Sequence, residues 1–222
     1  MQVFRRLMCL IAVLAPMLAA AAPINPQPGV EYVVLPTPQN TDTGKKIEVI
    51  EFFAYYCPHC NAFEPELNAW VKKQGERIVL KRVPIALNED VLVQQKLYFT
   101  LQAMGELDRL HQKVYDAIHK ERLRMNRDEM VFDWVAKQGV DRQKFADTFR
   151  SFGVAAAVRR AKAMMDAYKI DYWPRIIIDG RFQTSPSQAA ATLPDSVSEA
   201  EQNKAALQVM DVLVSKAISE KK

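Results

Sequence analysis

Two short segments rich in β-branched and aromatic residues predict the central strands of a sheet. The first covers residues 46–56 and becomes almost wholly apolar toward its end, which is typical of a strand buried on both faces. The second covers 77–85. Between them, apolar residues recur at helical spacing over 58–75. An alternating stretch at 30–35, in a proline-rich region, predicts a short edge strand ahead of this strand–helix–strand unit.

The hydrophobic pattern changes at Asn88. From there to Tyr168 glycine is sparse and apolar residues recur at helical spacing, so we expect roughly four or five helices. The N-cap candidates in this block are Asn88, Asn126 or Asp128, and Asp141. This part of the chain is therefore predicted to be all-helical.

Strand chemistry returns in the last quarter of the chain. Residues 172–178 end in a run of isoleucines, and the Asp179-Gly180 pair that follows, before 181–183, is a strong hairpin signal. A last amphipathic helix is predicted over 198–218. The order of these elements predicts an α/β fold into which an all-helical domain is inserted.

The N-terminus has the three parts of a cleavable export signal in the right order. Arg5 and Arg6 supply the charge, an apolar stretch follows at 7–18, and cleavage is expected after Ala20 or Ala21. A membrane anchor is the alternative, but the apolar run is shorter than the roughly 20 residues that a spanning helix needs. The expected organisation is a signal at 1–21, the two parts of the α/β domain at 22–87 and 169–222, and the helical domain at 88–168.

Removal of the signal changes both the charge and the cysteine count. The formal net charge of +4 falls to +2 when Arg5 and Arg6 leave, which is too small to indicate a nucleic-acid partner. Cys9 leaves as well, so the mature chain keeps Cys57 and Cys60, two residues apart, in a compartment that permits disulfides. With 49% apolar residues, the chain can build an ordinary core without a disulfide framework.

The Cys57-Pro58-His59-Cys60 segment is predicted to open the first long helix, since Pro58 suits a first helical turn. Cys57 would then face free backbone N–H groups and the positive end of the helix dipole, which favour a thiolate. His59 can donate a hydrogen bond or positive charge to that sulfur. Cys60 lies one turn further in and is expected to be the shielded, resolving thiol. Such a pair can exchange disulfides with other proteins.

The alternative for two closely spaced cysteines is half of a structural zinc site. Such a site needs two further ligands, and the other candidates are His59, His111 and His119. The last two are eight residues apart, outside the usual gap of about three to five, and both lie in the helical block, where they are expected to cap helices or face solvent. No metal is therefore expected.

The segment from Glu51 to Cys60, followed by Phe63-Glu64, resembles the active-site segment of the DsbA family of periplasmic thiol:disulfide oxidases. The resemblance implies a thioredoxin-like fold with an inserted helical domain, in agreement with the order of elements above. It also implies a periplasmic location, so the expected substrates are reduced, unfolded exported proteins.

The resemblance also implies roles for residues outside the cysteine motif. Trp173-Pro174 stands where the family keeps a cis-proline facing the dithiol, although Trp173 departs from the small or β-branched residue usual there. An edge-strand proline is the alternative. Glu51 corresponds to a buried acid that moves protons to or from Cys60, unless it is an edge carboxylate. The family's lysine partner for this acid would be Lys81.

Tyr55 and Tyr56 are expected either to flank the dithiol as apolar surface for substrates or to belong to the core. The sequence has no Gly-rich dinucleotide fingerprint, so no cofactor is expected. By resemblance, a DsbB-like membrane quinone reductase would then restore the Cys57–Cys60 disulfide. We expect a monomer, because residues 23–44 are too few for a dimerisation domain.

Two other functions stay open at the level of sequence. One is a disulfide isomerase or reductase of the same fold, which usually carries other residues than Pro-His between its cysteines. The other is a non-catalytic periplasmic binding or chaperone module in which the disulfide is only structural. A comparison of the stability of the reduced and the oxidised protein distinguishes these possibilities.

Overall fold

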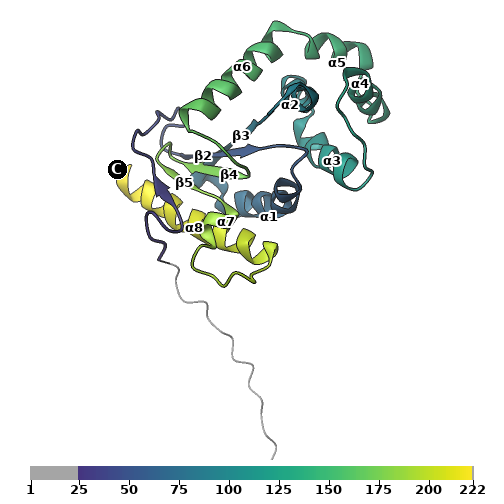
Figure 1. Ribbon diagram of the computed structural model, residues 1–222. Helices are drawn as coiled ribbons and strands as arrows, with labels where there is room; N and C mark the ends of the chain where they lie inside the picture. Colours follow the sequence, from purple (N-terminus) through teal and green to yellow (C-terminus); the bar gives the residue numbers. More distant parts are fainter. Residues whose placement is uncertain (1–24, 222) are drawn as a thin grey trace, which may run out of the picture.

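The computed structural model describes residues 25–221, so the predicted signal at 1–21 and Cys9 lie outside the described residues. The chain builds one mixed sheet in the order β1-β5-β4-β2-β3 (Figure 1). Its strands are β1 (Val33–Val34), β2 (Ile47–Phe53), β3 (Ile78–Pro84), β4 (Arg175–Ile178) and β5 (Phe182–Thr184). The strand β2 is parallel to β3 and antiparallel to β4, which gives the thioredoxin-like arrangement expected from the sequence.

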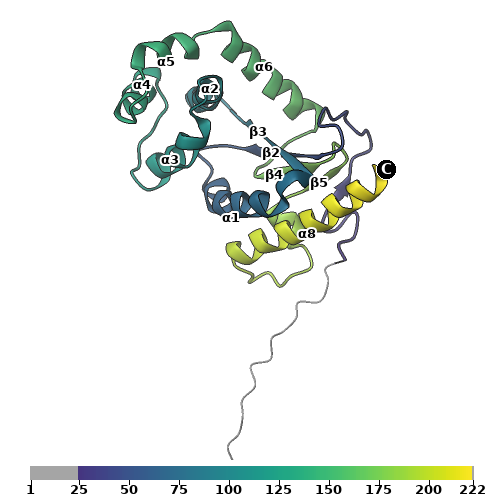
Figure 2. The same cartoon turned by 180° about the vertical axis from the view of Figure 1, so that it is seen from behind.

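One face of the sheet is covered by helices α1 (Pro58–Gln74), α7 (Pro186–Ala189) and α8 (Glu199–Glu220). Figures 1 and 2 show α1 and α8 side by side on this face. Ile47 and Val49 of β2 pack there with Leu67 of α1 and Val214 of α8. Because neighbouring strand residues point to opposite faces, Ile50 belongs to the core on the other face.

The helix α6 (Phe152–Ala167) covers that other face with its C-terminal half. Ala161 and Tyr168 pack there against Phe52 of β2 and Val83 of β3. All seven residues of β2 are buried because both faces of the sheet are covered, as its apolar composition predicted.

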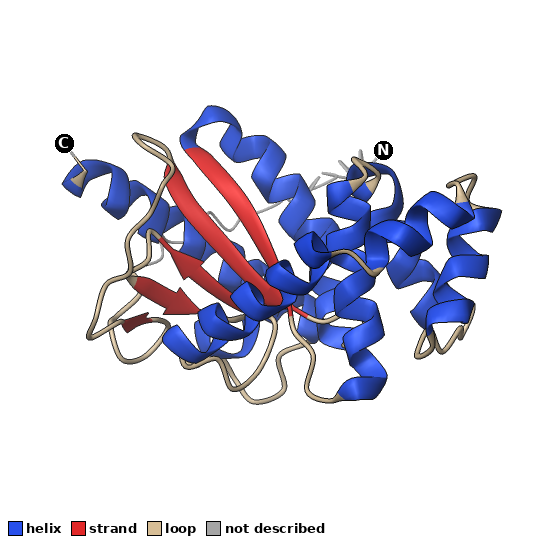
Figure 3. Cartoon of the chain, turned by 90° about the horizontal axis from the view of Figure 1, so that it is seen from above, coloured by secondary structure: helices blue, strands red, loops and turns tan. Residues whose placement is uncertain are grey.

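The remaining helices α2 (Glu89–Ala103), α3 (Leu107–His119), α4 (Asp128–Lys137) and α5 (Arg142–Phe149) form the inserted helical region together with α6 (Figure 3). This region has its own apolar core, to which each of these first four helices contributes. The same cluster includes Phe53, Cys57 and Cys60. The helical region therefore packs directly against the end of β2, where the dithiol lies.

Helix and strand ends follow local chemistry. Asn88 and Asp141 accept hydrogen bonds from the third residue after them and cap α2 and α5, as predicted. The prediction for α4 was wrong, because its N-cap is Arg127 and Asp128 already lies in the first turn, where its charge suits the helix dipole. The predicted strand at 46–56 ends at Phe53, because the chain turns there toward the helix.

The hairpin between β4 and β5 has the predicted turn. Asp179 and Gly180 have φ values of 53° and 64°, the left-handed geometry that a tight hairpin needs at both central positions. The short α7 and the 3₁₀ turn at Gly75–Arg77 were not predicted. A single helical turn has no hydrophobic period from which a sequence could reveal it.

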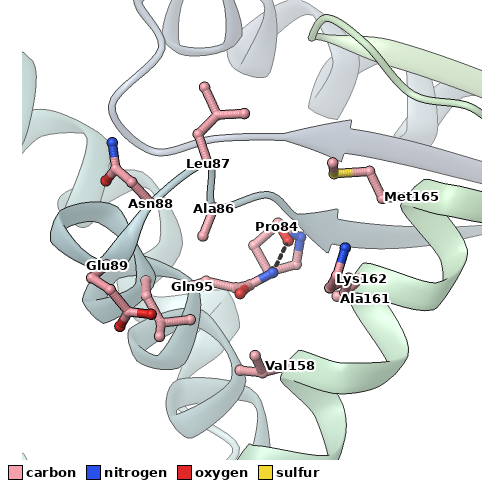
Figure 4. A pocket seen from close by; sticks show the side chains of 11 residues that line it. Pro84, Ala86, Leu87, Asn88, Glu89, Gln95, Val158, Ala161, Lys162 and Met165 are labelled. Carbon is pink, nitrogen blue, oxygen red and sulfur yellow. Dashed lines mark hydrogen bonds between the residues drawn. The ribbon is translucent and has the colours of Figure 1, made fainter.

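A cavity of about 310 Å³ lies between α6 and the loop that follows β3. Figure 4 shows Leu87 and Asn88 on one side of it and Lys162 on the other, with the Gln95 amide donating a 2.7 Å hydrogen bond to the Pro84 carbonyl. Neither cysteine lines this cavity. Within residues 25–221, no helix is long and apolar enough to cross a membrane.

Candidate active site

The strand β2 delivers the chain to Cys57 through a turn closed by a 3.1 Å hydrogen bond from the Cys57 N–H to the Ala54 carbonyl. Cys57 is the N-cap of α1, and its sulfur accepts a 3.4 Å hydrogen bond from the backbone N–H of Cys60. Pro58 occupies the first helical position, where a missing N–H costs nothing. The cysteine pair thus opens the helix as the sequence predicts.

The two sulfurs are free thiols in very different environments. The pKa of Cys57 is lowered to about 6, first by the hydrogen bond from the Cys60 thiol, then by backbone N–H groups and the charge of His59, against the effect of burial. Burial, the Cys57 charge and the Glu51 charge all hold the pKa of Cys60 well above its ordinary value. Only Cys57 is therefore suited to be a thiolate at neutral pH.

The Trp173-Pro174 peptide bond is cis, as predicted, and its loop faces the dithiol. The Cys57 thiol lies 3.8 Å from the Trp173 carbonyl oxygen. The Trp173 indole packs edge-on against the ring of Tyr56, with centroids 6.2 Å apart. Trp173 therefore forms one wall of the site.

A groove of about 410 Å³ runs beside this loop. It combines aromatic and proline surface with a few polar side chains, and it lies next to the exposed part of the cysteine motif. The residues that line it are His59, Tyr172, Trp173, Pro174, Pro186, Ser187, Glu199, Gln202 and Asn203. An extended peptide carrying a cysteine could lie in such a groove.

His59 is exposed, and of the two interactions expected from the sequence its ring supplies positive charge to Cys57, while its Nδ1 bonds another residue. Its Nδ1 lies 2.6 Å from Oε1 of Glu199 in α8. The hydrogen bond to Glu199 raises the pKa of His59, against a smaller opposite effect of burial. His59 thus acts on Cys57 through its backbone N–H and through the charge of its ring.

Glu51 is fully buried in the middle of β2, beneath the dithiol, and not at an edge. Burial, and next the Glu64 charge, raise the pKa of Glu51 to about 8 in spite of Arg82, whose Nε donates to Glu51 Oε2 at 3.1 Å. The expectation of Lys81 as its partner is wrong. Lys81 forms ion pairs with Asp42 and Glu48 instead, since neighbours on a strand point to opposite faces.

A buried polar cluster next to Glu51 was missed at the level of sequence. Arg82 also donates to Glu64 at 2.8 Å, and His111 Nε2 lies 3.2 Å from the same carboxylate. Burial alone would raise the pKa of Glu64, but His111 and Arg82 lower it overall. The available signal was Glu64 itself, a charged residue between Phe63 and Leu67 on the apolar face of α1.

The remaining aromatic and histidine candidates divide between core and site. Tyr55 is buried and its hydroxyl bonds Nδ1 of His111 at 2.7 Å, so of the two alternatives left open by the sequence it belongs to the core. Tyr56 is half-buried beside the dithiol. His119 bonds the Tyr55 carbonyl at 2.7 Å, so neither helical histidine simply faces solvent. Across residues 25–221, no three His, Cys, Asp or Glu side chains are grouped to hold a metal ion.

Comparison with known proteins agrees with this geometry. Residues 42–193 match a thioredoxin family model. The thiol:disulfide interchange protein DsbA of Bordetella parapertussis is 45% identical, over 82% of this chain and 87% of the relative. The DsbA of Burkholderia cepacia is 39% identical, over 78% and 82%. The crystal structure of Pseudomonas aeruginosa DsbA superposes with a TM-score of 0.77 at 31% identity, over 87% of this chain and 96% of that one.

The chain thus shares with these relatives both a large part of its sequence and the thioredoxin-like fold with a helical insertion. Its two neighbouring cysteines lie at the start of a helix, as a thiol-disulfide exchange site requires. This protein belongs to the DsbA family of thiol:disulfide interchange proteins and is a thiol-disulfide oxidoreductase.

Proposed function

We propose that this protein is a dithiol oxidase, which donates a Cys57–Cys60 disulfide to reduced, unfolded proteins after their export to the periplasm. The observation that carries the proposal is the low pKa of Cys57, about 6, beside a Cys60 whose pKa is raised. A thiolate stabilised in this way favours the reduced form of the pair over the disulfide. The oxidised protein is therefore ready to pass its disulfide on.

The proposed reaction has two exchange steps. A substrate thiolate attacks the Cys57 sulfur and breaks the Cys57–Cys60 bond, so that Cys60 leaves as a thiolate and takes up one proton. A second substrate thiolate then attacks the substrate sulfur of the mixed disulfide and expels Cys57 as a stable thiolate. The substrate loses two electrons and leaves with a disulfide, and both electrons remain on the cysteine pair.

Glu51 is proposed as the group that supplies the proton to Cys60. Its pKa of about 8 means that Glu51 carries a proton at neutral pH. Its ionised form raises the pKa of Cys60, so the two groups influence each other's protonation. The unpartnered Oε1 of Glu51 is available for this transfer. Pro174 and Trp173 are proposed to present backbone and ring surface to the substrate chain beside Cys57.

The proposal includes the cellular setting implied by the family. The signal at 1–21 would direct the chain to the periplasm, and the mature protein, with its helical domain at 88–168 between 22–87 and 169–222, would act as a monomer. A DsbB-like membrane quinone reductase would take the two electrons and regenerate the disulfide, since the proposed cycle needs an electron acceptor outside this chain.

The central test is the oxidation of a reduced, unfolded protein that needs disulfides to regain activity. The oxidised protein should restore that activity stoichiometrically. Cys57→Ala should abolish it, because the attacked sulfur is gone. Cys60→Ala cannot form the Cys57–Cys60 disulfide and should fail as well. When that variant is instead given a substrate that already carries a disulfide, its Cys57 thiolate should attack it, expel one substrate thiolate and remain trapped in a mixed disulfide, because the resolving thiol is missing. Failure of the oxidised wild-type protein to transfer its disulfide would refute the proposal.

The competing functions give different results in two measurements. In a disulfide isomerase or reductase, the reduced cysteine pair would be less strongly favoured over the disulfide. Such an enzyme would also act on substrates that contain wrong disulfides. A structural disulfide in a binding module would make the oxidised form melt at a higher temperature than the reduced form. For an oxidase, the reduced form should melt higher.

A further inference from the structure

Glu199, the first residue of α8, lies against the segment between the two cysteines. Its Oε1 is 2.6 Å from Nδ1 of His59, across a sequence separation of 140 residues. Both side chains line the groove beside Trp173 and Pro174. The contact therefore joins the C-terminal helix to the active-site helix at the place where a substrate chain would lie.

We propose that Glu199 is a positioning residue for disulfide exchange, which holds His59 in place as an imidazolium so that its charge stabilises the Cys57 thiolate. This inference rests on the oxidase function proposed above. It adds that the Glu199–His59 contact adjusts how strongly oxidising the cysteine pair is. Glu199 acts through His59 and contacts neither sulfur in the exchange.

The charges on the three groups are mutually dependent. The hydrogen bond to Glu199 is the main cause of the raised pKa of His59, and the Cys57 charge raises it further. In return, the charge of His59 lowers the pKa of Cys57. The titratable groups around His59 are Glu199 from α8 and Cys57 at the start of α1, whose charges act on it, and Tyr172, which lines the same groove.

Removal of the Glu199 charge should change the redox equilibrium at neutral pH and have little effect at acidic pH. At about pH 7, above the ordinary pKa of histidine, His59 would lose its proton without Glu199, and the thiolate would lose a nearby positive charge. At about pH 5, His59 is protonated in either protein, and Cys57, with a pKa of about 6, is mostly a neutral thiol, so Glu199 has little thiolate on which to act through His59. The variant should therefore be the weaker oxidant at the higher pH alone.

The test compares Glu199→Gln with Glu201→Gln in the full mature protein. Glu201 lies in the same first turn of α8 and carries the same charge, but it binds Ser198 and does not touch His59. Glutamine can take its place in the capping box, so α8 should still form. The control variant therefore separates a general loss of negative charge from loss of the contact with His59.

Two readouts are measured, the His59 titration by NMR and the equilibrium constant for reduction of the disulfide by glutathione. In Glu199→Gln, the pKa of His59 should fall toward its ordinary value, and at about pH 7 the equilibrium constant should fall about two- to fivefold, the range of an exposed ion pair. At about pH 5 this difference should vanish. In a His59→Gln background, Glu199→Gln should no longer weaken the oxidant at about pH 7.

Three results would overturn the inference. These are an unchanged pKa of His59 in Glu199→Gln, the same change in the equilibrium constant at both pH values, or an equal effect of Glu201→Gln. The His59 titration reports on Glu199 whether or not the protein is an oxidase. A wild-type protein that fails to oxidise substrates would instead overturn the proposed function.

Discussion

Arg82 faces two buried carboxylates, Glu51 at 3.1 Å and Glu64 at 2.8 Å. One guanidinium cannot balance two buried negative charges, and His111 lies on the Glu64 side. The cluster therefore resolves into an ionised Glu64 and a protonated Glu51, the carboxyl whose ionised form interacts with the charges of both cysteines. The charge balance of the cluster thus leaves a proton next to Cys60.

Glu51→Gln should reduce the pH dependence of stability. The pKa of Glu51 is about 8 in the folded protein against an ordinary value of 4.5, so the folded state binds more protons than the unfolded state between these values. Its contribution to stability is therefore full below the ordinary value and is lost as pH rises through about 8. Urea unfolding at several pH values should show a smaller decline in the variant, and an unchanged decline would contradict the raised pKa.

Arg82→Met should destabilise the protein by about 3–5 kcal/mol, because it removes the guanidinium that pairs with the buried Glu64 carboxylate and donates to Glu51. Arg142→Met is the matched control, since Arg142 forms ion pairs with Glu129 and Asp133 on the surface. It should cost about 1 kcal/mol or less. Equal losses for the two variants in chemical denaturation would show that the buried cluster carries no special charge balance.

At the scale of elements, the sequence predicted what local chemistry controls. The central strands, the helix opened by Cys57 and the hairpin at Asp179-Gly180 follow from apolar periodicity and turn residues. The partners across elements did not follow. Whether Lys81 or Arg82 faces Glu51 depends on strand register, and the His59–Glu199 contact depends on how α8 packs against α1. The spacing of residues in a single sequence determines neither of these contacts.

Gly180→Ala tests the hairpin turn that orders β4 and β5. Gly180 has φ of 64°, and a Cβ there would lie 2.2 Å from the Gln39 carbonyl oxygen. Gly105→Ala is the matched control, since Gly105 has φ of 72° with nothing within 4 Å of the added Cβ. The control should cost about 1 kcal/mol from the backbone alone, and Gly180→Ala about 1–3 kcal/mol more from the clash. Equal costs in denaturant unfolding would rule out the clash.

At the scale of the whole molecule, the dithiol lies where the sheet domain meets the helical region. Cys57 and Cys60 belong to the same apolar cluster as Leu101, Val114 and other helical-region residues. The helical region therefore shields Cys60, which has no exposed surface, while Cys57 keeps an exposed fraction of 6% beside the cis-proline loop. This asymmetry between the two sulfurs comes from the packing of segments that are distant in the sequence. It makes Cys57 the sulfur that a substrate attacks and Cys60 the sulfur that leaves.

The most direct test of this asymmetry is the equilibrium of the cysteine pair with reduced and oxidised glutathione. If the Cys57 thiolate is stabilised as described, glutathione should reduce the Cys57–Cys60 disulfide readily, and the reduced protein should predominate even when much glutathione disulfide is present. A pair that stays oxidised while most of the glutathione is reduced would contradict the account.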